Sequence, residues 1–157
     1  MKMKFIFLAV IILIVAAFFI FSGNASSFEV INNFEGKIEM YKSSSCGCCG
    51  VYANYLQRNG NSNADIISLE SVSGIKKAYN VPSALESCHT TIIGDYFVEG
   101  HIPLEAVEKL LTEKPDIAGI AMPGMPEGSP GMLGKKIGDF VIYAVNYDGS
   151  YGEFMRI

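Results

Sequence analysis

Two short stretches in the first half of the chain alternate apolar and polar residues, and this two-residue period predicts β-strands. The stretches are KIEMYK (residues 37–42) and ADIISLE (residues 64–70). Between them, residues 51–60 show helical periodicity, with Val51 and Tyr55 on one face of the expected helix. The first half of the chain therefore predicts a strand, a helix and a second strand.

The middle of the chain continues this alternation of elements. A helix is expected over residues 72–79, ending before Pro82, and two strands are expected to meet at a turn at Gly94. Residues 104–112 form a helix that Pro103 opens. With a right-handed crossover between the first two strands, this order predicts an α/β fold, a thioredoxin-like small sheet flanked by helices.

The last third of the chain departs from such a minimal domain. Residues 118–132 are rich in proline, glycine and methionine, which excludes a helix or a central strand and predicts a loop. Residues 139–157 alternate again and predict a β-hairpin that turns at Asp148. We therefore expect a thioredoxin-like metal-binding domain over residues 37–157, preceded by a linker at residues 28–36.

The first 27 residues differ in kind from the rest. Lys2 and Lys4 precede an uncharged run of 17 residues, from residue 5 to residue 21, and the small residues of SGNASS follow it. This pattern is typical of a signal peptide, and the run is also close to the length of an N-terminal membrane anchor. Because the basic end stays inside, both alternatives predict an exported protein, either periplasmic or anchored at the membrane outside the cytoplasm.

Charge and composition narrow the function classes. Half of the residues are hydrophobic, which suits one globular domain. Without the two N-terminal lysines, ten basic residues face 16 acidic ones, a net charge of −6. An acidic body argues against nucleic acid as a partner.

All four cysteines lie in two places, in the C-x-C-C stretch of SSSCGCCG and in ESCHTT: Cys46, Cys48, Cys49 and Cys88. In the expected fold, the first stretch lies at a helix start, where free amide groups lower thiol pKa values. The segment that enters the third strand packs beside this loop. The fold therefore predicts that the two cysteine stretches meet.

Several chemistries suit such a cluster in an exported protein. Cys46 and Cys49 form a C-x-x-C pair of the kind that performs thiol-disulfide exchange. Four thiolates suit a structural zinc site, although the C-x-C-C spacing fits poorly to two separate C-x-x-C turns. Soft thiolates also bind and bridge copper(I). Two plain disulfides are the ordinary alternative for exported cysteines.

The remaining candidate ligands favour copper. Met122, Met125 and Met132 offer soft thioethers, which zinc, calcium and magnesium do not prefer, although the ordinary role of any single methionine is to fill a gap in the core. The only histidines, His89 and His101, lie in the part of the expected fold that faces the cysteine loop.

Three segments resemble the small exported CopG-type copper-resistance proteins, a thioredoxin-like family formerly filed as a domain of unknown function. The segments are YKSSSCGCCGVYANYLQRNG, VPSALESCHTTIIGDYFVEGHIPLEAVEKLL and AMPGMPEGSPGM. The resemblance runs from about residue 37 to residue 132 and extends loosely into the C-terminal hairpin.

This resemblance implies a cysteine-bridged copper cluster, found beside copper-export and copper-oxidation systems. The motif residues of the family fall on the C-x-C-C cysteines, the cysteine of C-H-T, the histidine of G-H-x-P and three methionines: Cys46, Cys48, Cys49, Cys88, His101, Met122, Met125 and Met132. It thus implies an exported protein that sequesters or relays Cu(I) in copper resistance, with copper-export or copper-oxidation proteins as partners. The alternative is a thiol-disulfide or copper-dependent oxidoreductase.

Overall fold

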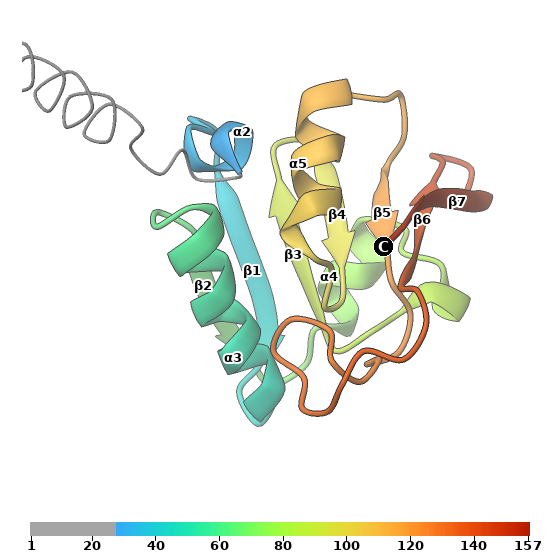
Figure 1. The fold of residues 1–157 in the computed structure, drawn as a ribbon. Helices are drawn as coiled ribbons and strands as arrows, with labels where there is room; N and C mark the ends of the chain where they lie inside the picture. The colour runs from blue at the N-terminus through green and yellow to red at the C-terminus, as the bar shows by residue number, and fades with distance from the viewer. Residues whose placement is uncertain (1–27) are drawn as a thin grey trace, which may run out of the picture.

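A computed structural model of the chain describes residues 28–157 (Figure 1). Residues 1–27, and with them the expected signal peptide or anchor, lie outside the described residues. Within residues 28–157, no helix combines the length and the apolar character needed to cross a bilayer.

The described residues fold around one seven-stranded mixed sheet with the order β2-β1-β3-β4-β5-β6-β7. The pairs β1/β2 and β4/β5 are parallel, and the remaining neighbours are antiparallel. The strands are β1 (Ile38–Ser43), β2 (Asp65–Leu69), β3 (His89–Ile93), β4 (Tyr96–Glu99), β5 (Gly119–Ala121), β6 (Val141–Val145) and β7 (Tyr151–Arg156).

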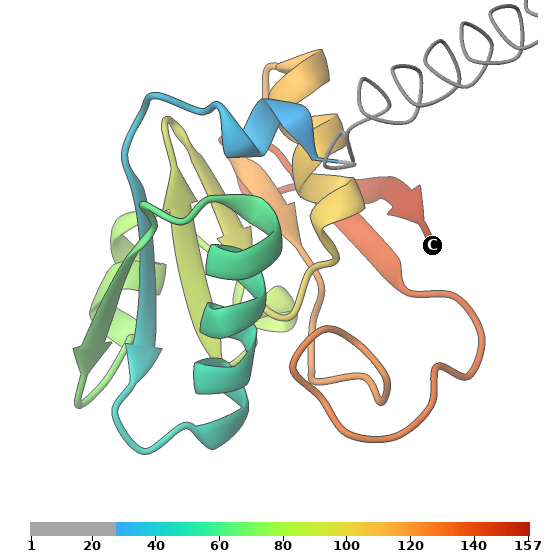
Figure 2. The same ribbon diagram turned by 60° about the vertical axis from the view of Figure 1, so that its left-hand side comes forward.

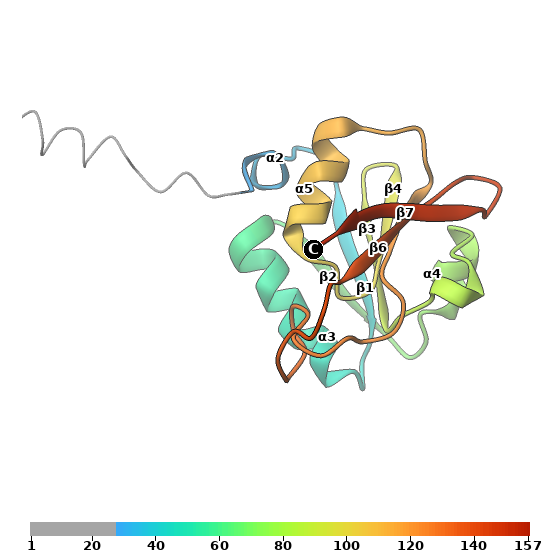
Figure 3. The same ribbon diagram turned by 45° about the vertical axis from the view of Figure 1, so that its right-hand side comes forward.

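Helices cover both faces of this sheet. Figures 2 and 3 show α3 and α5 on one face and the short α4 on the other. The helical segments are α2 (Glu29–Asn32), α3 (Gly47–Tyr55), a π-helical turn η1 (Leu56–Gly60), α4 (Ser73–Ala78), a 3-10 turn η2 (Ser83–Leu85) and α5 (Leu104–Glu113). The α/β class expected from the sequence is therefore confirmed.

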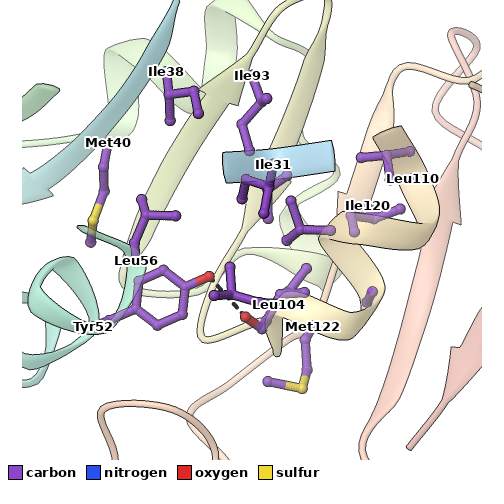
Figure 4. Close-up of a cluster of buried hydrophobic side chains, with 14 of the residues drawn as sticks. Ile31, Ile38, Met40, Tyr52, Leu56, Ile93, Leu104, Leu110, Ile120 and Met122 are labelled. Carbon is purple, nitrogen blue, oxygen red and sulfur yellow. Dashed lines mark hydrogen bonds between the residues drawn. The ribbon is translucent and has the colours of Figure 1, made fainter. Parts of the chain in front are cut away.

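The larger hydrophobic core lies between the sheet and the α3/α5 layer (Figure 4). Tyr52 of α3 and Leu104 of α5 are both at most 1% exposed, and the Tyr52 hydroxyl donates to the Ile102 carbonyl at 2.8 Å. A smaller core on the opposite face includes Ile92 and Phe97. Together the two cores fix the strand ends that carry the cysteines and histidines.

The segment expected as a linker contains a packed element. Its Ile31 is fully buried in α2, and the amides of Val30 and Ile31 donate to the Glu108 carboxylate of α5 at 2.8 and 3.0 Å. The sequence of residues 28–36 is polar and contains glycine, so it suggested a linker. One buried isoleucine is not enough to produce a helical pattern that the sequence could reveal.

One further expectation was wrong in detail. Gly119–Ala121 forms β5 between β4 and β6, although residues 118–132 were expected to exclude a central strand. A Cβ atom on Gly119 would lie 2.2 Å from the Phe97 carbonyl oxygen, so glycine permits the close pairing there. In the helical region expected over residues 51–60, Val51 is 55% exposed, and Tyr52 and Leu56 are buried in the core.

Candidate metal centre

The first cysteine stretch connects β1 to α3. Because β1 and β2 are parallel, the chain must cross over after β1, and α3 begins in that crossover. Cys46 is the N-cap residue, and the Cys49 amide donates to its sulfur at 3.3 Å. Cys46, Cys48 and Cys49 thus surround the first turn of α3, as expected from the sequence.

A disulfide joins Cys46 to Cys49, whose Cα atoms are 5.4 Å apart. The Cys48 sulfur lies 3.5 Å from that of Cys46, and Cys48 and Cys88 are free thiols. The C-x-x-C pair therefore exists in its oxidised form beside two reduced sulfurs.

The second cysteine stretch reaches the same place through the sheet. β3 pairs antiparallel with β1, and His89 at the start of β3 lies opposite Lys42 near the end of β1. Cys88 therefore lies beside the α3 start. The four cysteine sulfurs, of Cys46, Cys48, Cys49 and Cys88, all lie within 4.8 Å of one another. The expected meeting of the two stretches is what the structure shows.

His101 points a ring nitrogen at this cluster. Its Nε2 lies 3.0 Å from the Cys88 sulfur, and its Nδ1 lies 2.7 Å from the Pro130 carbonyl oxygen. A carbonyl oxygen only accepts, so Nδ1 of the neutral ring carries the proton and donates it. The lone pair of Nε2 then faces the Cys88 thiol. A backbone contact of this kind is how proteins orient imidazole ligands toward a metal.

His89 is a second imidazole at the same sulfur. Its Nδ1 lies 3.3 Å from the Cys88 sulfur, and its ring packs 4.5 Å from the Tyr52 ring between centroids. The ligand atoms of Cys88, His89 and His101 also lie within 4.8 Å of one another. The buried Nε2 of His89 has no hydrogen-bond partner among the described residues. Cys88 is therefore common to a four-sulfur group and to a group of one sulfur and two imidazoles.

Burial sets the protonation of this part of the centre. Burial lowers the pKa of His89 well below its usual range, with the charges of His101 and Lys76 adding to the effect. Burial also lowers the pKa of His101, although the Pro130 carbonyl opposes the shift. Both rings are thus neutral, the form that binds metals. Burial, followed by repulsion from Cys48, raises the pKa of the Cys88 thiol to about 11.

The methionine-bearing loop (residues 122–140) touches the centre through its backbone. Besides the Pro130 carbonyl, Gly131 packs so closely that a Cβ atom there would lie 2.9 Å from the Tyr52 amide nitrogen and 3.1 Å from the Cys48 carbonyl oxygen. Of the methionines expected as ligands, Met122 is 1% exposed in the core, Met125 is 51% exposed and Met132 is partly buried. Met122 packs in the same core cluster as Cys49, and the loop also contacts the centre through the Pro130 carbonyl and Gly131.

The sequence placed His89 on the side of the fold that faces the cysteine loop, but the ligand set implied by the resemblance did not include it, and Tyr52 was not expected as its packing partner. The Cys-His dipeptide was the available signal for His89. No sequence pattern indicated a further pair, Lys76 and Glu99. The two side chains are bonded to each other, and Glu99 also accepts from the Ser87 amide next to Cys88.

Chemically, this arrangement can hold a soft metal. Four sulfurs and two neutral imidazoles converge, and two of the sulfurs become available on reduction of one disulfide. Thiolates are soft ligands that bind and bridge copper(I) ions, whereas calcium and magnesium prefer oxygen ligands.

Comparisons with known proteins identify the relatives of this chain. A family described as "Protein of unknown function, DUF411" matches residues 85–132, which include Cys88, His101 and the three methionines. No curated protein sequence matches the chain.

Two solved structures match over most of their length. They are titled "Copper resistance protein copG- Form 1" and "Copper resistance protein copG- Form 2", each 33% identical, with TM-scores of 0.70 and 0.68. In each case the match covers 78% of this chain and 98% of the other. This chain therefore belongs to the family of the CopG copper resistance proteins.

Proposed function

We propose that this protein binds Cu(I) through the thiolates of its four cysteines and thereby sequesters or relays copper in copper resistance. The observation that carries the proposal is the convergence of all four sulfurs within 4.8 Å. The Nε2 lone pair of His101, facing Cys88 at 3.0 Å, supplies a nitrogen ligand to the same centre. Met122, Met125 and Met132 are proposed as thioether ligands that cap the site when the loop adjusts to bound copper.

The C-x-C-C spacing along the chain supports a multinuclear site. Three thiolates packed this closely in the sequence do not readily all bind one ion, but they can bridge neighbouring Cu(I) ions. Cys88 belongs to both groups of candidate ligands, so it is the sulfur that would link ions held by the α3 cysteines to ions held by imidazole.

Loading requires electrons and releases protons. Two-electron reduction of the Cys46–Cys49 disulfide by an external thiol reductant gives two thiols, and the reductant becomes the disulfide. Copper then replaces the thiol protons, including that of Cys88, whose raised pKa keeps it protonated in the metal-free protein. Copper affinity should accordingly fall in acid.

A competition experiment tests the proposal. The full-length chain is reduced without oxygen, loaded with Cu(I) or Zn(II) against a chelator, and then treated with an alkylating reagent. We expect several copper ions per chain, with all four cysteines protected, and weaker retention of zinc. A reduced protein that loses copper to the chelator, with four alkylated cysteines, would contradict the proposal. The disulfide form is the matched control, since it should bind less copper.

A second candidate, an oxidoreductase, is favoured by one observation. The Cys46–Cys49 disulfide lies at the start of α3, the position from which a C-x-x-C pair exchanges with substrate disulfides. Free Cys88 lies beside it and would compete with a substrate thiol for any mixed disulfide. Rapid insulin reduction that is abolished by Cys46→Ser would support thiol-disulfide exchange over pure binding. A copper-dependent oxidation that needs Cys88 would support the copper-dependent form.

We propose further that the protein acts outside the cytoplasm, either released or anchored at the membrane. Support comes from the two lysines and the uncharged run of 17 residues at the N-terminus. Fractionation of cells that express the chain, with mass analysis of its N-terminus, would distinguish cleavage near residue 25 from retention of the apolar run. Recovery in the cytoplasm would contradict export.

A further inference from the structure

A buried ion pair lies beneath the cysteine that enters β3. Glu99 closes β4 with a side chain that is 0% exposed, and the ammonium group of Lys76, 5% exposed, bonds to it from α4. Removing two charges from water is costly, and an apolar pair of similar size is often as stable or more stable. Stability alone is therefore a weak reason for this pair.

The Glu99 carboxylate accepts hydrogen bonds from residues on both sides of Cys88. One oxygen accepts from the Ser87 amide at 2.6 Å, and the other accepts from the Thr90 hydroxyl at 2.6 Å. Lys76 also donates to the Thr90 hydroxyl at 3.2 Å. Cys88 and His89 lie between Ser87 and Thr90, so the bonds that these two residues make with Glu99 fix the position of the Cys88–His89 backbone.

Glu99 is also linked to the methionine-bearing loop, through Ser87 and through its own main-chain carbonyl. The Ser87 hydroxyl donates to the Gly124 carbonyl at 2.5 Å, and the Met122 amide donates to the Glu99 carbonyl at 3.0 Å. Gly100, at φ 88°, lies so close to both segments that a Cβ atom would be 2.6 Å from the Met122 oxygen and 2.8 Å from the Ser87 Cβ. Three segments that carry candidate ligands thus meet at residues 99 and 100.

We infer that Glu99, held by Lys76, is a positioning residue for copper: it fixes Cys88 and His89 through Ser87 and Thr90, and the methionine-bearing loop through Ser87. This inference rests on the proposed function. Supporting contacts outside the ligand set commonly govern metal affinity. An apolar pair could fill the same space but could not accept from an amide and a hydroxyl at once.

Two double variants separate positioning from stability. Lys76→Met with Glu99→Gln keeps an acceptor for the Ser87 amide without charge, whereas Lys76→Met with Glu99→Leu removes it. We measure Cu(I) affinity by chelator competition, alkylation of each cysteine in the copper-loaded full-length protein, and the melting temperature. Glu113→Gln, which removes an exposed ion pair with Lys109, is the control and should change none of these.

The leucine variant should bind Cu(I) more weakly by about 10-fold or more, with Cys88 open to alkylation and the α3 cysteines protected. The glutamine variant should retain most of the affinity and the protection of Cys88. Equal affinity and equal Cys88 protection in the two variants would overturn the inference. A wild-type protein that fails to retain Cu(I) would instead overturn the proposed function, and this inference with it.

Should the leucine variant fail to fold, Thr90→Val decides. This change removes the hydroxyl that donates to the Glu99 carboxylate and accepts from Lys76, and it leaves the ion pair and the bond from the Ser87 amide in place. Severalfold weaker copper binding at an unchanged melting temperature would support the inference, and wild-type affinity would overturn it.

Discussion

The candidate metal centre has two halves of different construction. The helix half consists of Cys46, Cys48 and Cys49, which are close in sequence at the start of α3. The sheet half consists of Cys88 and the two imidazoles, which β3 and the segment after β4 bring together. Two sulfurs of the helix half are joined as a disulfide, whereas the sheet half carries a free thiol and two buried rings.

This difference separates two kinds of control over metal binding. The helix half responds to electrons, because its disulfide must be reduced before Cys46 and Cys49 can act as ligands. The sheet half responds to protons, because burial raises the pKa of Cys88 and lowers that of His89. A metal that needs both halves therefore needs a reduced protein and a pH that is not acidic.

The largest expected effect on copper binding comes from removing the cysteine that is common to the two groups of candidate ligands. Cys88→Ser should sharply reduce the number of Cu(I) ions bound per chain, because Cys88 is common to both ligand groups. The measurement is copper stoichiometry of the reduced full-length chain after chelator competition. Ser44→Ala, on an exposed residue of the same loop, is the control. Unchanged stoichiometry in Cys88→Ser would show that the helix half binds copper by itself.

A smaller effect concerns the metal-free protein, with its Cys46–Cys49 disulfide intact, at different pH values. The folded-state pKa values of His89 and His101 are lowered by burial, so the unfolded chain binds protons more readily. Stability should therefore be lost as the pH falls below about 6.5, by up to about 1.4 kcal/mol per pH unit for each ring. The pKa of Cys88 is raised to about 11, so its contribution should be lost as the pH rises from about 9 through 11.

Urea unfolding at pH 5, 7 and 10 checks this dependence. We expect the highest free energy of unfolding at pH 7. His101→Asn should flatten the acid limb, since it removes one of the two rings. Equal stability at pH 5 and pH 7 in the unaltered protein would mean that the rings accept protons within the folded state.

The two halves also differ in how far the sequence could predict them. The C-x-C-C stretch follows an alternating strand and indicated a helix start. A helix start depends mainly on residues that are neighbours along the chain, so the sequence alone could predict it. The meeting with Cys88 followed from the order of strands and helices. Lys76 and Glu99 could not be predicted, since their pairing depends on the depth at which α4 packs on the sheet.

The methionine-bearing loop shows a second limit. The proline and glycine content of residues 118–132 correctly indicated an irregular backbone for most of the segment. The same composition led us to exclude a strand, although Gly119–Ala121 forms β5. The methionines of the loop suggested thioether ligands, but the sequence did not indicate the contacts that the Pro130 carbonyl and Gly131 make with the centre. Backbone groups are the same in every residue, so residue types alone could not reveal these contacts.

The smallest expected effect tests that backbone contact directly, with two glycines of the same loop. Gly131 and Gly124 both have positive φ angles, of 84° and 73°, so alanine should be strained by about 1 kcal/mol at either position. Only at Gly131 would the added Cβ also meet α3, at the Tyr52 amide and the Cys48 carbonyl, whereas at Gly124 it would meet nothing within 4 Å. Gly131→Ala should therefore lower the free energy of unfolding more than Gly124→Ala, as measured by urea unfolding. It should also weaken Cu(I) binding, because moving the loop withdraws the Pro130 carbonyl that orients His101. Equal losses in both variants would mean that the loop is free to shift away from α3 without cost, and the helix half would then be independent of it.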